Sequence, residues 1–189
     1  MKVSLFLGCI LVSLTMQAQL PYYELPEAPN SYKAGAVVSR LIDGLGFRYY
    51  WATEGLRKED LAFRSTEASR NVRETLEHIY TLSEMTLSAA EQRVMKPQQV
   101  NGLSFKELRK LTLENFYKAS NILVNTDDLS AYPLKIQRKE GVTTLPFWNQ
   151  LNGPIADALW HVGQVVSFRR MSGNPFPKGV SLLTGTVKK

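Results

Sequence analysis

Apolar residues recur every three or four positions in four separate stretches of the chain. The stretches cover about residues 31–54, 69–92, 104–123 and 152–171. This spacing places the apolar side chains of each stretch on one side of a helix. Four helices that each have one side to bury predict an all-α protein, namely a four-helix bundle with a single core.

Polar residues at the expected helix starts support these boundaries. Ser104 and Glu107 form the S-x-x-E pattern of a capping box before the third stretch. The second stretch has two candidate caps, Ser69 and Asn71, and Asn71 stands three residues before Glu74. The long connection before the last helix, residues 134–150, predicts either a short hairpin or an irregular loop.

The ends of the chain differ in character from the four stretches. Lys2 precedes a mostly apolar segment that ends near Ala18, so residues 1–18 are predicted to be a cleaved signal peptide. The alternative is a retained membrane anchor. Residues 19–30 contain three prolines and predict an extended arm, residues 31–172 form the bundle, and residues 173–189 are expected to be an extended tail. We therefore expect an exported protein, periplasmic or secreted, that does not contact the membrane after cleavage.

Charge and cysteine content exclude several kinds of chemistry. The chain has 23 Lys and Arg against 17 Asp and Glu, a net charge of +6. These charges are dispersed rather than gathered with aromatic residues, so we expect no nucleic-acid partner. Cys9, the only cysteine, lies in the predicted leader. The mature chain therefore has no disulfide, thiol nucleophile or thiolate ligand.

The two histidines of the chain, His78 and His161, belong to the second and fourth helical stretches. Asp157 precedes His161 by four residues, so both side chains lie on one side of a helix. Two imidazoles and a carboxylate form a three-ligand set that leaves positions open on zinc, nickel or iron. Glu74, one turn before His78, is a further candidate ligand or ligand partner. The alternative is that both histidines are structural and that Asp157 only complements the helix dipole.

The fourth stretch shows how the candidate site relates to the apolar side. Ile155, Leu159 and Val162 are predicted to form its apolar face together with Val166. A second stripe mixes an acid, an imidazole, an amide and a ring, and consists of Asp157, His161, Gln164 and Phe168.

Three segments of the chain resemble the DinB-like proteins. ADALWHVGQVVSFRR resembles their last helix, in which a histidine is followed by a Gly-Gln pair and then arginine. NVRETLEHIYTLS resembles their second helix and RLIDGLGFRYYWATEGL their first. The resemblance covers roughly residues 31–172 and implies a four-helix bundle of the DinB-like type, often a homodimer.

The resemblance also implies a divalent metal held by three histidines. His78 and His161 match two of these ligands, while Asp157 replaces the first histidine of the last helix. Characterised relatives are thiol-dependent transferases or isomerases, in which the metal lowers the pKa of a cofactor thiol. Because low-molecular-weight thiols are mainly cytosolic, export favours hydrolysis by metal-activated water, or no catalysis.

Further residues are weaker candidates for the chemistry of such a site. Gln164 could hydrogen-bond a ligand or a metal-activated water, and Arg169 or Arg170 could hold an anionic group. Four aromatic residues either line a pocket or pack in the core and loops: Trp51, Phe147, Trp148 and Trp160.

Two functions of different classes remain open from the sequence. One is a divalent-metal-dependent enzyme, a hydrolase or thiol-dependent transferase acting on an unknown small molecule, with its site between the second and fourth helices. The other is a non-catalytic exported bundle that has lost the metal site and binds a partner.

Overall fold

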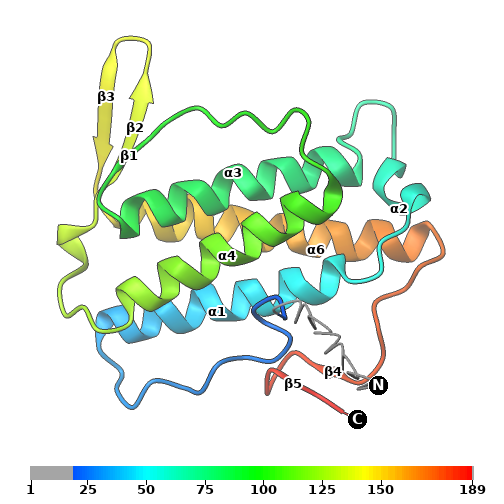
Figure 1. The fold of residues 1–189 in the computed structure, drawn as a ribbon, viewed down its shortest axis with the longest axis horizontal. Coiled ribbons are helices and arrows are strands. Elements are labelled where there is room, and N and C mark those ends of the chain that lie inside the picture. Colours follow the sequence, from blue (N-terminus) through cyan, green and yellow to red (C-terminus); the bar gives the residue numbers. More distant parts are fainter. Residues whose placement is uncertain (1–18, 189) are drawn as a thin grey trace, which may run out of the picture.

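The computed structural model describes residues 19–188, which are mostly helical with two small sheets. The predicted leader lies outside the described residues. Four long helices lie side by side (Figure 1): α1 (Ala34–Thr53), α3 (Val72–Ala90), α4 (Phe105–Leu123) and α6 (Ala156–Met171). They correspond to the four predicted stretches. Two short helices, α2 (Lys58–Ala62) and α5 (Trp148–Gln150), were not predicted.

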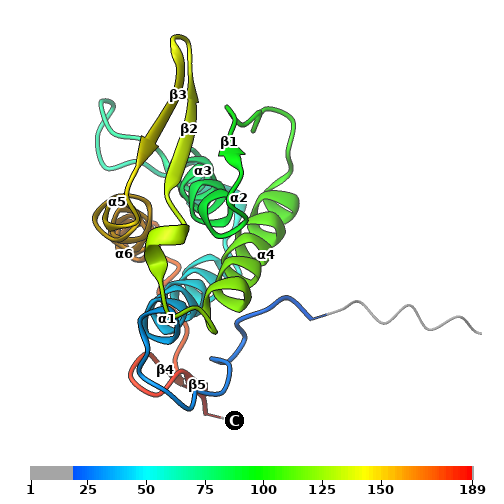
Figure 2. The same cartoon turned by 90° about the vertical axis from the view of Figure 1, so that its left-hand side faces the viewer.

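The long helices surround one hydrophobic core. The α4 helix packs against α1 and α3, and α6 packs against the same two helices from the other side (Figure 2). Each helix contributes fully buried side chains, such as Ile42, Leu76, Phe116 and Val165. Burial of an apolar side chain of this size contributes about 1.5–3 kcal/mol. The amphipathic pattern therefore predicted the main helices and the shared core.

The predicted all-α class is incomplete, because the structure also contains β-strands. The connection left open between hairpin and loop is a hairpin, in which β2 (Leu134–Arg138) pairs antiparallel with β3 (Gly141–Leu145). A two-residue strand, β1 (Val94–Met95), pairs parallel with β2. Met95, Leu134 and Ile136 form a small second cluster beneath this sheet. β1 pairs with a segment about 40 residues away in sequence. A two-residue strand has no pattern of apolar and polar residues from which this pairing could be predicted.

The caps of two helices are those that the sequence indicates. Asn71 accepts a hydrogen bond from the backbone N–H of Glu74, and the Glu74 carboxylate accepts one from the backbone N–H of Asn71. Ser104 and Glu107 form the same reciprocal pair. Asn71, rather than Ser69, therefore starts α3, and Glu74 serves the helix end instead of pointing at His78.

The start of the last helix differs from the expectation. Helical structure begins at α5, and a π-helical turn, η2 (Leu151–Ile155), joins α5 to α6. Gly153 leaves the helical region with φ −100° and ψ −108°, directly before Pro154. Because proline has no N–H and crowds the preceding turn, the wider turn accommodates it without ending the helix. Regular α-helix then starts at Ala156, one residue before Asp157.

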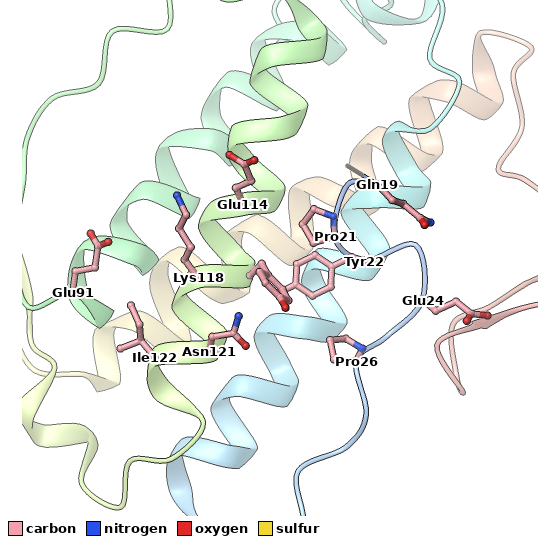
Figure 3. Close-up of a pocket in the computed structure, with 11 residues that line it drawn as sticks. Gln19, Pro21, Tyr22, Glu24, Pro26, Glu91, Glu114, Lys118, Asn121 and Ile122 are labelled. Carbon is pink, nitrogen blue, oxygen red and sulfur yellow. The ribbon is translucent and has the colours of Figure 1, made fainter. Parts of the chain in front are cut away.

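The arm and the tail are fastened to the helices and to each other. Tyr22 of the arm is buried between α1 and α4 (Figure 3). Its hydroxyl donates to Asp43 Oδ1 at 3.0 Å. The tail is not simply extended, because β4 (Val180–Ser181) and β5 (Thr186–Val187) form a second hairpin. The backbone N–H of Leu25 donates to the carbonyl of Gly185 at 2.9 Å, which links the two ends.

Within residues 19–188, the structure has no helix with both the length and the apolar character needed to span a bilayer.

Candidate metal centre

The three predicted ligands come together between α3 and α6. His78 lies on α3, while Asp157 and His161 lie one turn apart at the start of α6. One potential ligand atom from each residue lies within 4.8 Å of the other two. Asp157 Oδ2 is 3.0 Å from His78 Nε2, and Asp157 Oδ1 is 3.4 Å from His161 Nε2. The carboxylate of Asp157 thus contacts both histidines, one of which lies 79 positions earlier in the sequence.

The two imidazole rings are held at an angle to one another. Their centroids are 4.8 Å apart and their planes are inclined by 85°. Each ring presents Nε2 to the carboxylate between them. Both imidazole nitrogens thus lie beside the same carboxylate, and the ligands of one small ion must likewise lie near one another.

The cluster of His78, Asp157 and His161 lies between α3 and α6, near the protein surface. The side chains of His78, Asp157 and His161 are 28%, 39% and 18% exposed. The histidines are therefore mostly enclosed by the protein, while the carboxylate retains access to solvent. Such a site can hold an ion and still admit a water or a small molecule.

The surroundings of His78 favour its neutral form. Partial burial lowers the pKa of His78, and the charges of Arg70 and His161 act in the same direction. The hydrogen bond to Asp157 raises the pKa but does not offset the burial. A neutral imidazole is the form that ligates a metal ion.

Gln164 holds the second imidazole rather than reaching for a ligand. His161 Nδ1 and Gln164 Oε1 are 2.8 Å apart on the same helix. Because a carboxamide oxygen only accepts, Nδ1 of His161 carries the proton in this pair. In the neutral imidazole Nε2 then carries the lone pair, as a metal ligand requires. Gln164 thus contacts His161, and its hydrogen bond to a ligand stays a prediction.

Arg169 does not contribute to the cluster. It is 2% exposed and donates from Nη1 to the backbone carbonyls of Trp51 and Ala52, both at 3.0 Å. Its Nε donates to the carbonyl of Asn174 at 2.9 Å. Arg169 therefore joins the end of α1 to the segment after α6, whereas Arg170 is exposed. The prediction that Arg169 holds an anionic substrate is not supported by these contacts.

The aromatic candidates divide into two groups. Trp51 and Phe147 are buried in the core, whereas Trp148 and Trp160 are 75% and 78% exposed. A groove of about 880 Å³ lies elsewhere, between the arm and α4 (Figure 3). It is lined by Tyr22, Tyr117 and Ile122 among others. None of the three cluster residues lines this groove.

The donor set fits a divalent ion of the zinc, nickel or iron class. Two neutral imidazoles and a carboxylate are ligands that these ions accept, and a hydrogen-bonded partner orients one of the imidazoles. The hydrogen bonds of His78 with Asp157 and of His161 with Gln164 also form without an ion. The geometry thus brings the three candidate ligands together and leaves metal binding to experiment.

Comparison with protein-family models, with curated proteins and with solved structures gives no match to this chain. The assignment of function therefore depends on the site itself.

Proposed function

We propose that this chain is an exported, DinB-like four-helix bundle that binds a divalent metal and acts as a metal-dependent hydrolase or thiol-dependent transferase on a small molecule. The observation that carries the proposal is the convergence of His78, Asp157 and His161 from two helices onto one point. These are the positions that the resemblance to DinB-like proteins assigns to the metal.

His78, Asp157 and His161 would hold the ion, and a bound ion would supply a Lewis acid that lowers the pKa of a water or thiol next to it. The protein supplies the arrangement. Gln164 keeps Nδ1 of His161 protonated, so that Nε2 faces the cluster. The exposure of Asp157 keeps one side of the cluster accessible to a small molecule.

The second candidate is a non-catalytic exported bundle that binds a partner. Two observations favour it: a carboxylate replaces the histidine of the family pattern, and Asp157 forms a hydrogen bond with His78 without an ion. In that case the three residues act as a polar link between α3 and α6.

Metal content of the chain starting at Gln19 separates these candidates. Elemental analysis and calorimetric titration with zinc, nickel and ferrous iron are expected to show near-stoichiometric binding. His161→Ala is expected to abolish binding, and Asp157→His to preserve or strengthen it by creating three imidazoles. Asp127→Asn, an exposed carboxylate far from the cluster in sequence, is the matched control and should bind as the wild type does.

Absence of metal from the wild type after reconstitution with all three ions would rule out the enzyme and favour the polar link. In that case His161→Ala should still lower the stability of the protein. Binding that survives in both His78→Ala and His161→Ala would place the ion elsewhere.

A further inference from the structure

The β2–β3 hairpin extends beyond the ends of the long helices (Figures 1 and 2). Strand order is β1-β2-β3, so β3 is an edge strand, and its outer side pairs with no other strand among residues 19–188. Residues 141–144 are exposed, and Val142 is 49% exposed. The free backbone N–H and C=O groups of an exposed edge are able to pair with another strand.

Apart from its short length of five residues, the edge lacks the devices that usually prevent such pairing. The sequence of β3, GVTTL, contains no charged residue and no proline. Its register with β2 is regular from Leu134–Leu145 to Arg138–Gly141, without a bulge. Val and Thr side chains favour strand pairing. The composition and regular register of β3 therefore favour pairing of its free edge with another strand.

The charges at the two ends of the hairpin indicate which partner fits. The tip has two exposed cations and one anion, Arg138, Lys139 and Glu140, and none of them forms an ion pair within the described residues. At the base, Asp127, Asp128 and Trp148 line a cavity of about 340 Å³. Only one cation, Lys33, pairs with these acids. The tip is therefore net positive and the base net negative.

A second copy of the chain matches both features at once. In an antiparallel pair of β3 strands related by a two-fold axis, the tip of each hairpin lies beside the base of the other. The positive tip then meets the negative base and the exposed Trp148 ring, which attracts cations. If the two-fold axis passes beside Thr143, this residue lies opposite Thr143 of the second copy. The paired strands then bring no like charges together.

We propose that β3 is a self-association surface, through which two copies of this chain join their sheets by antiparallel β3–β3 pairing centred on Thr143. The surface is independent of the metal cluster. Its area is small, so we expect a dimer that dissociates in the micromolar range.

Single-cysteine variants test the register directly, because the chain starting at Gln19 contains no cysteine. Directly opposed residues of an antiparallel pair have Cα atoms about 4.5–5.5 Å apart, which a disulfide can span. Thr143→Cys is expected to form a covalent dimer on mild oxidation. Val142→Cys, whose expected neighbour is the partner's Thr144, and Thr66→Cys in an exposed loop are the matched controls and should link much less. Equal linking of all three variants would overturn the proposed register.

Sedimentation velocity over a concentration series tests the association itself. Thr143→Lys and Thr143→Glu should each weaken self-association by about tenfold or more, because like charges then face each other on the axis. A mixture of the two variants should recover dimers, whereas Thr66→Lys should behave as the wild type. A wild type that remains monomeric throughout the micromolar range, or charge variants that fail to recover when mixed, would overturn the proposal whatever the metal measurements show.

Discussion

The carboxylate of Asp157 lies 3.0 Å from His78 Nε2, across the boundary between α6 and α3. Its second oxygen lies 3.4 Å from Nε2 of His161, its neighbour on the same helix. The residue that departs from the three-histidine pattern is therefore the one that connects the other two. Because the side chains around these three residues make separate contacts, each can be tested with its own substitution.

Gln164 is predicted to support metal binding without touching the metal. Gln164→Ala removes the acceptor for His161 Nδ1, so both tautomers of the imidazole become accessible. Loss of such a supporting hydrogen bond typically weakens metal affinity by about 10–100-fold. Gln164→Glu keeps an acceptor and should bind at least as tightly as the wild type. Calorimetric titration measures the affinities, and Ser167→Ala on the exposed side of α6 is the control.

Arg169 is predicted to stabilise the fold and to leave metal binding unchanged. Arg169→Met leaves the carbonyls of Trp51 and Ala52 without their donor, which should lower the free energy of unfolding by about 3 kcal/mol. Urea denaturation measures this loss, and the exposed Arg170→Met should change stability by about 0.5 kcal/mol or less. A stable Arg169→Met protein with reduced activity would instead assign Arg169 to substrate binding.

Asp60 should make stability fall in acid. Hydrogen bonds from the Arg57 side chain, and then from Ser172, Arg57 N–H and Asn174, hold the pKa of the fully buried Asp60 carboxyl well below its usual range. Because the folded pKa is depressed, this stabilisation is complete above the unfolded pKa, about 3.9, and is lost as the pH falls toward the folded value.

Asp60→Asn should therefore be less stable than the wild type at pH 7, and the difference should narrow at about pH 3. Urea denaturation at both pH values measures the two differences. The exposed Glu67→Gln is the control. An equal loss of stability at both pH values would mean that the Asp60 charge contributes nothing.

The arm should detach when Gly46 acquires a side chain. The ring of Tyr22 occupies the space in which a Cβ on Gly46 would lie. Gly46→Ala should therefore displace the arm, expose residues 19–26 to protease and hydrogen exchange, and leave the buried Asp43 without its donor.

Gly44 provides the matched helix substitution. The only atom near a Cβ at Gly44 belongs to the flexible end of Arg48, so Gly44→Ala should keep the arm in place and stabilise α1 by up to about 1 kcal/mol. Protection of residues 19–26 that is equal in both variants would mean that Tyr22 does not anchor the arm.

The sequence alone was sufficient for the features that depend on neighbours along the chain. The spacing of apolar residues determines the four long helices, and the reciprocal pairs Asn71–Glu74 and Ser104–Glu107 determine where two of them begin. Asp157 and His161 share one side of a helix because four residues make about one turn. The convergence of both with His78 agrees with the ligand set predicted from sequence.

Tertiary structure determined those features that depend on the rotation of each helix relative to its neighbours. The predicted apolar face of the last helix included Leu159, which is 38% exposed, whereas Ala158 and Val165 are fully buried. The helix is rotated because it must bury Ala158, Val162 and Val165 while presenting Asp157 and His161 to α3. Arg169 is internal for a similar reason, since its donors satisfy backbone carbonyls at the end of α1 that sequence spacing cannot reveal. Local periodicity sets which residues share a face, and only packing between distant segments sets what that face meets.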